Sequence, residues 1–223
     1  YICRQMEQMG LEEEIPESSL GLEKNRNNQM EPLWGTEIFP EYYSRFEKAA
    51  RETEGVTLTW EGHFIDPLFT HTTTGFTRPG DEEHPYLASV SCVHDPEEEG
   101  FVQEMIMQPE EAAKRVSAIP AGDGSFRTIP PEAFPEQVQI ISRDEAGYAL
   151  QLQIGGFPFN GEEVRLALGL PSACFELNRH GSDVRFTVRG RGHGWGLSQT
   201  EAQALAEDGW SAEAILEYFY TGI

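Results

Sequence analysis

The sequence has little positive charge. Only 16 of its 223 residues are Lys or Arg, against 38 Asp plus Glu, so the formal net charge is −22 at pH 7. Such a chain repels a phosphate backbone and offers no broad positive face from which counterions could be released. We therefore expect no nucleic-acid partner.

Cysteine is scarce, and long apolar runs are missing. Cys3, Cys92 and Cys174 are an odd number without CxxC or Cys/His spacing, which predicts packed thiols rather than a disulfide framework or a zinc module. No stretch approaches the roughly 20 apolar residues that a membrane helix needs. Hydrophobic residues still make up 39% of the chain, so a globular core is expected.

Apolar periodicity predicts several helices. Ile2, Met6 and Met9 share one helical face, and the lack of a capping residue before it predicts that this helix begins upstream, in a longer protein. Residues 12–35 are polar and irregular, which predicts a long loop. Further helices are expected over residues 41–53, 109–117 and 161–168, and over two C-terminal segments that begin after Ser198 and Ser211.

Short alternating segments predict hairpins and strands. The paired segments are 56–60 with 63–70, 138–141 with 148–154, and 175–177 with 184–188, and a further strand is expected over 86–90. The acidic stretches 81–84 and 95–99 are typical of solvated surface. We predict a mixed α/β fold of the α+β type, hairpin-rich and antiparallel, with short helices and a C-terminal helical pair. Residues 1–223 are expected to form a single region, with an insertion or hinge at 118–135.

The glycine segment, residues 190–199, carries one imidazole among alternating glycines. Gly192, His193 and Gly194 lie just before a helix N-terminus, where free N–H groups favour an anionic or carbonyl-bearing ligand. Ser198 followed by Glu201 predicts a capping box. The alternative is structural: the glycines let a strand turn tightly into a helix, and His193 caps that turn.

The threonine segment, residues 71–77, offers an imidazole and four hydroxyls. His71, Thr72, Thr73, Thr74 and Thr77 suit a polar ligand, although a threonine-rich edge turn is the alternative. Neither His71 nor His193 has a partner at metal-ligand spacing, so we expect neither metal nor cofactor.

The glycine and threonine segments, with several others, resemble parts of a known protein family. The stretch GRGHGWGLSQTEAQALAEDGW resembles the closing signature of the stage II sporulation protein D family, which is related to the amidase-enhancer proteins. LALGLPSACFEL, HTTTGFT and AARETEGVTLTWEGHFID resemble three earlier segments of that family, and YICRQ is similar to the end of its Ala-Arg-Thr-Tyr helix. The resemblance therefore covers nearly the whole chain.

The resemblance implies a lytic transglycosylase that cleaves peptidoglycan glycan strands during forespore engulfment. It implies an extracytoplasmic place in the cell envelope, with any membrane anchor upstream, and membrane-anchored engulfment proteins as partners. The substrate-binding residues implied are His71, Thr72, Thr73, Thr74, Gly75, Thr77, Gly192, His193, Gly194, Ser198 and Gln199.

Two departures from the family pattern matter. The family's acid is a Glu in a Glu-Met-Pro segment before the Ala-Arg-Thr-Tyr helix, and the chain starts after it, so the catalytic residue is unknown. Where some members carry a Thr-His-Cys-Gln zinc element, this chain has Asn27, Asn28 and Gln29. A noncatalytic peptidoglycan-binding modifier of another hydrolase is kept as the alternative function, because the resemblance to the amidase-enhancer proteins allows it.

A cluster of arginines precedes the glycine segment. Arg179, Arg185, Arg189 and Arg191 have only Asp183 among them to oppose their charge. They predict a positive rim that would attract the carboxylates of peptidoglycan stem peptides. The alternative is that they pair with nearby surface acids.

Overall fold

The computed structural model describes residues 2–10 and 27–223. The chain divides into two compact units, residues 1–66 with Ile223, and residues 67–222. Whether residues 1–223 act as a single functional region stays a prediction. Residues 12–26 of the predicted long loop lie outside the described part. Its end is not a loop, because residues 27–34 form a helix.

The first unit holds three helices and one short hairpin among the described residues. The helices are α1 (Ile2–Met9), α2 (Asn27–Trp34) and α3 (Phe39–Glu52), and Pro40 lies in the first turn of α3 as predicted. The hairpin pairs β1 (Thr59–Trp60) with β2 (His63–Phe64) across Glu61 and Gly62, which both have positive φ. The predicted strand over 63–70 is wrong in its extent, because β2 ends at Phe64.

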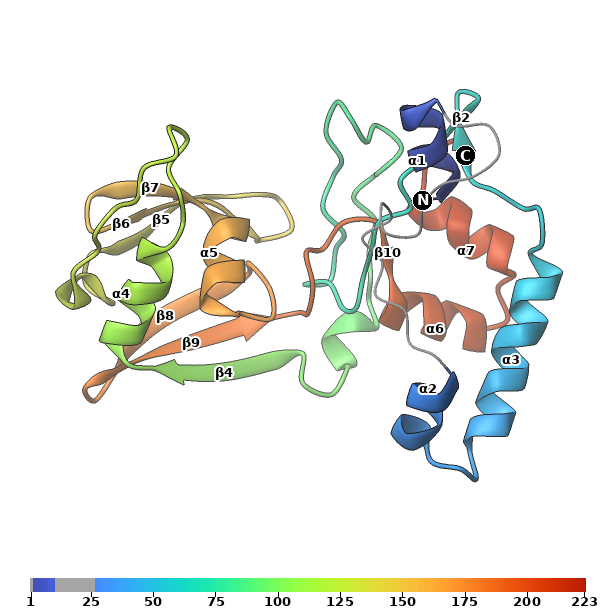
Figure 1. The fold of residues 1–223 in the computed structure, drawn as a ribbon, viewed down its shortest axis with the longest axis horizontal. Coiled ribbons are helices and arrows are strands. Elements are labelled where there is room, and N and C mark those ends of the chain that lie inside the picture. Colours follow the sequence, from blue (N-terminus) through green and yellow to red (C-terminus); the bar gives the residue numbers. More distant parts are fainter. Residues whose placement is uncertain (1, 11–26) are drawn as a thin grey trace. The chain divides into compact units, whose positions relative to one another are not determined.

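The second unit contains two three-stranded antiparallel sheets and two helices beside them (Figure 1). One sheet has the order β4 (Val102–Met107), β9 (Asp183–Arg189), β8 (Phe175–His180). The other has the order β5 (Val138–Arg143), β6 (Ala149–Ile154), β7 (Phe157–Asn160). The helices α4 (Pro109–Ser117) and α5 (Gly161–Leu168) match their predicted ranges. Strands β4 and β7 were not predicted from the sequence.

The main core lies between these sheets and helices. Alternate residues of β9 point inward, so Val184, Phe186 and Val188 are fully buried. Both helices and both sheets contribute to the same cluster. Residues 118–135 add Ile119, Ile129, Ala133 and Phe134 to it, the last two in or beside a short 3-10 helix, η3 (Pro131–Ala133).

The remainder of the second unit is built on a short parallel pairing. Strand β3 (Phe69–Thr70) pairs with β10 (Leu197–Ser198), which leads into α6 (Gln199–Glu207) and then α7 (Ala212–Phe219). The mixed α+β fold and the C-terminal helical pair are confirmed. The strand expected at 86–90 is absent in the described structure, where Leu87 makes a single bridge to Tyr220. No helix in the described ranges is long and apolar enough to cross a membrane.

Candidate functional site

The threonine and glycine segments lie against each other although some 120 residues separate them. Beyond the β3–β10 pairing, Thr72 and Arg191 exchange two backbone hydrogen bonds, of 3.0 and 2.8 Å. The Arg78 N–H donates to the Gly194 carbonyl at 2.8 Å. The two segments singled out from the sequence therefore form one backbone unit.

A buried carboxylate joins the two segments. Asp95 opens the 3-10 helix η2 (Asp95–Glu97) and is fully buried. Its Oδ2 accepts hydrogen bonds from the Thr73 N–H at 2.6 Å and the Thr73 hydroxyl at 2.5 Å, while the Ser198 hydroxyl lies 2.8 Å from Oδ1. The prediction of a solvated acid at this position is wrong. Asp95 was not predicted from the sequence, because it begins the acidic stretch 95–99, which is typical of solvated surface.

A buried thiol lies beside this network. Burial, together with the charge of Asp95, raises the pKa of Cys92 to about 12. Cys174 is also buried, and burial likewise raises its pKa. The prediction of packed thiols is confirmed for these two cysteines, and Cys3 is free and half-buried.

The remaining threonine hydroxyls of the segment bond to the protein itself. Thr72 Oγ1 lies 2.9 Å from Thr200 Oγ1, Thr74 donates to the Ala146 carbonyl at 2.5 Å, and Thr77 donates to the Ala88 carbonyl at 2.9 Å. Thr72, Thr73 and Thr77 are buried, while Thr74 is half-buried. These contacts shape the segment, and their use for a ligand stays a prediction.

Three of the predicted glycines adopt conformations that disfavour other residues. Gly75, Gly192 and Gly194 have φ of +109°, +112° and +86°. A methyl group at Gly192 would overlap Thr70 Oγ1, and one at Gly194 would overlap the Tyr148 ring. Glycine is therefore required at positions 192 and 194 by close approach as well as by backbone angle.

The His193 imidazole is held as a neutral ring. It is half-buried, and its Nδ1 accepts the Trp195 N–H at 3.1 Å, which places its own proton on Nε2. Desolvation lowers the pKa of His193, with the Arg165 and Arg78 charges lowering it further and the Glu162 charge opposing them. His71 is half-buried and its Nδ1 lies 2.7 Å from Thr72 Oγ1. That both imidazoles face one groove stays a prediction.

The start of α6 differs from the predicted capping box. Ser198 does cap the helix, since its hydroxyl accepts the Glu201 N–H at 3.4 Å. The Glu201 carboxylate, however, accepts the His94 N–H at 2.8 Å and contacts His94 Nδ1 at 3.1 Å. Glu201 is only 2% exposed, so it ties α6 to the loop before η2. Gln199, the first residue of α6, is exposed.

The arginine cluster is largely paired. Arg179 lies 2.6 Å from Glu136 and Arg189 lies 3.3 Å from Glu176, both at the surface, and the half-buried Arg185 lies 3.6 Å from Glu104. Three of the four arginines therefore pair with nearby acids, which is the alternative given above, and do not form the predicted positive rim. Arg191, within the glycine segment, is exposed.

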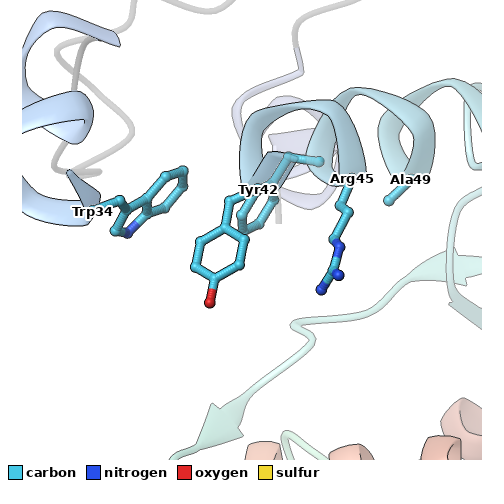
Figure 2. A pocket seen from close by; sticks show the side chains of 5 residues that line it. Trp34, Tyr42, Arg45 and Ala49 are labelled. Carbon is cyan, nitrogen blue, oxygen red and sulfur yellow. The ribbon is translucent and has the colours of Figure 1, made fainter. Parts of the chain in front are cut away.

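The first unit carries an aromatic groove, lined by Trp34, Tyr42, Arg45, Phe46 and Ala49, that was not predicted from the sequence. The volume of the groove is about 530 Å³. The Tyr42 and Arg45 side chains project from α3, and Trp34 lies beside Tyr42 (Figure 2). Trp34 stacks on Phe46 with ring centroids 5.6 Å apart. Phe46 is 61% exposed, so this face of α3 is apolar and open.

No set of three His, Cys, Asp or Glu side chains within residues 2–10 and 27–223 is placed to hold a metal ion. The absence of a metal requirement stays a prediction.

Comparison with known proteins shows which proteins this chain is similar to. The chain matches no protein-family model. It is 28% identical over 200 residues to the stage II sporulation protein D of Bacillus amyloliquefaciens, covering 88% of this chain and 55% of that protein. The protein of the same name from Bacillus subtilis strain 168 is 28% identical over 201 residues, covering 87% of this chain and 54% of its own length.

The chain is similar to stage II sporulation protein D. This similarity supports the resemblance inferred from the motifs. The chain spans about half the length of these relatives.

Proposed function

We propose that this chain belongs to the stage II sporulation protein D family and forms the glycan-binding part of an extracytoplasmic protein of the cell envelope. The protein acts in sporulation, on peptidoglycan glycan strands during engulfment of the forespore, by lytic transglycosylation. The observation that carries the proposal is the similarity along 88% of the chain to proteins of that name, with both motif segments built into one backbone unit.

The proposed reaction needs one acid and no activated water. A carboxylic acid protonates the glycosidic oxygen, the bond to the anomeric carbon breaks, and the 6-hydroxyl of the same sugar closes on that carbon. The hydroxyl proton passes to the carboxylate, which restores the acid, and the product is a 1,6-anhydro sugar. By resemblance, the acid is a Glu in a segment upstream of Tyr1.

The polar groups that would meet the glycan are the less buried ones of the two segments. His71, Thr74, His193 and Gln199 are half-buried or exposed. Glycan hydroxyls and acetamido groups both donate and accept hydrogen bonds, which suits imidazole, hydroxyl and amide partners. The buried Thr72, Thr73, Thr77 and Ser198 would then hold the backbone that presents them.

A second function is favoured by the carboxylates around the two segments. Asp95 and Glu201 are buried with their oxygens bonded to donors of the chain, and Asp144 and Glu162 both bind Arg78. None of these four is free to protonate a glycosidic oxygen. This favours a chain that binds glycan without cleaving it, as a modifier of another cell-wall hydrolase would.

The experiment uses two chains, residues 1–223 and a longer one that adds an upstream Glu-Met-Pro segment. Both are incubated with peptidoglycan stripped of stem peptides, and binding by co-sedimentation is measured beside mass analysis of 1,6-anhydro products. We expect the shorter chain to bind without releasing product and the longer one to release it. Product from residues 1–223 would show that one of its own carboxylates is the acid, and failure of both chains to bind would overturn the proposal.

A variant tests the glycine segment directly. His193→Ala removes a half-buried ring whose hydrogen bonds in the described structure are to the backbone of Trp195 and of Phe69, so the fold should persist while glycan binding weakens. If the variant unfolds instead, His193 is a structural cap.

Membrane-anchored engulfment proteins are the partners that we propose for the full-length protein, and co-purification with a detergent-solubilised envelope fraction tests them.

A further inference from the structure

Arg78 follows the threonine segment and lies buried against the glycine segment. Only 3% of it is exposed. Its guanidinium carbon lies 3.7 Å from the centroid of the Trp195 ring and 4.8 Å from that of the Tyr148 ring. Arginine stacks on aromatic faces in this way and tolerates burial better than lysine does, because its charge is delocalised and weakly hydrated.

The polar atoms of Arg78 bind the carbonyls of two successive peptide units, one on each side of Gly194. Nη1 donates to the His193 carbonyl at 3.2 Å, and the Arg78 backbone N–H donates to the Gly194 carbonyl at 2.8 Å. Because the next residue, Trp195, packs on the guanidinium, three consecutive residues of the glycine segment contact Arg78, two of them through its side chain and Gly194 through its backbone. These glycines have no side chains with which to hold the loop themselves.

Arg78 is in turn anchored by two carboxylates from separate elements. Nε donates to Asp144 at 2.5 Å, in the turn between β5 and β6, and Nη1 donates to Glu162 at 3.0 Å, in the first turn of α5. Glu162 also accepts from Arg165 at 2.7 Å. Two cations and two carboxylates balance one another, so the buried charge is compensated and the guanidinium has a defined place.

We propose that Arg78 is a positioning residue, which fixes the glycine segment so that the His193 imidazole is presented to the glycan in one orientation. This inference rests on the proposed glycan-binding function of the glycine segment. A lysine cannot replace Arg78, because one ammonium cannot bridge both carboxylates and the His193 carbonyl while stacking on two rings. The arginine acts through His193 and Trp195 and is itself covered by them.

The test separates positioning from simple stabilisation by observing His193 itself. In the native protein, nitrogen NMR of the ring should show one neutral tautomer, with the proton on Nε2. The charged groups acting on this ring are Glu162, Arg165 and Arg78, of which the two arginines lower its pKa. Arg78→Met should therefore raise the pKa of His193 and mix the tautomers.

Arg78→Lys keeps the positive charge but loses the guanidinium that links Asp144, Glu162 and the His193 carbonyl. The pKa of His193 should therefore stay low while the two neutral tautomers of its ring mix. Both variants should weaken co-sedimentation with glycan about tenfold, the effect of losing one well-placed hydrogen bond.

Arg115→Met is the matched control. Arg115 also joins two elements, through Glu111 and the Leu168 carbonyl, but does not touch the glycine segment. It should lower the melting temperature and leave both the His193 spectrum and glycan binding unchanged. A native His193 spectrum in Arg78→Met, or equal changes in Arg115→Met, would overturn the inference.

If Arg78→Met does not fold, the tautomers of His193 in Arg78→Lys decide the inference, and a native His193 spectrum in that variant would overturn it. Failure of the wild-type chain to bind glycan would overturn the proposed function, while the His193 spectra would still decide whether Arg78 positions the ring.

Discussion

The Asp95 carboxylate lies 2.8 and 2.9 Å from the Ser198 hydroxyl, joining residues 103 positions apart. Ser198 is both the last residue of β10 and the cap of α6, and Asp95 also binds Thr73. One buried acid therefore fixes the threonine segment, the glycine segment and the start of a helix. All of its donors are needed, because a buried carboxylate is costly unless its oxygens are hydrogen bonded.

Asp95→Asn should destabilise the protein strongly. The amide keeps the shape but turns one acceptor into a donor that faces the Thr73 or Ser198 donors. We expect a loss of about 2–4 kcal/mol in the free energy of unfolding, measured by urea denaturation. Asp123→Asn is the control, because Asp123 is exposed and bonds only within its own turn to Ser125, so its effect should stay below about 1 kcal/mol. Equal effects at the two positions would contradict the assignment of Asp95 as a buried junction.

Gly194→Ala should lower the free energy of unfolding by more than the strain of its backbone angle alone explains. Its φ is +86°, and the added methyl group would overlap the buried Tyr148 ring. Gly181→Ala is the matched control, because Gly181 has φ of +63° but open space around it, in the turn between β8 and β9. We expect about 1–2 kcal/mol at Gly181 from strain, and at least about 1 kcal/mol more at Gly194 from overpacking. Similar melting temperatures for the two variants would show that the Tyr148 ring yields easily.

The contact between His94 and Glu201 should make stability depend on pH. The hydrogen bond to Glu201 raises the pKa of His94 above its ordinary value of 6.5. A raised pKa means that the folded state holds the proton more tightly, so this stabilisation is complete below pH 6.5. It is lost as the pH rises from there through the folded-state pKa.

The measurement is the free energy of unfolding of the wild type and of His94→Gln across that range. The wild-type advantage should shrink as pH rises. Because the two proteins share every other ionisable group, only the difference between the two curves reports on His94. Parallel curves would show that His94 does not gain a proton-dependent partner on folding.

Removal of metal should have no effect. The segment that matches the zinc element of some family members has Asn27, Asn28 and Gln29, which leaves no His or Cys there. Treatment with a chelator should change neither the melting temperature nor glycan co-sedimentation, since a structural metal contributes directly to folding free energy. Stoichiometric zinc in the purified protein would contradict this prediction.

Local signals predicted helices well. The range of α5 followed from Asn160, whose side chain accepts the Glu162 and Glu163 N–H groups, and from Gly169, which ends the helix with φ of +71°. The caps Ser198 and Ser211 were equally readable. Strands were predicted less well. β7 has only four residues and contains Pro158, and residues 86–90 look like a strand but make a single bridge. Strand formation depends on a partner, and the partners of β4 and of Leu87, which are β9 and Tyr220, are distant in sequence.

The sequence by itself determined the local helix boundaries, the mixed α+β class and the two motif segments, because caps, periodicity and glycine act over a few residues. It also carried the resemblance that the comparison supports. Only the tertiary structure decided that Asp95 is buried, that Glu201 binds His94 rather than its own helix cap, and that Arg78 holds the glycine segment. Each of these charged side chains looks like a surface residue in the sequence. Each becomes a buried junction because folding brings it to donors or acceptors between 22 and 115 residues away.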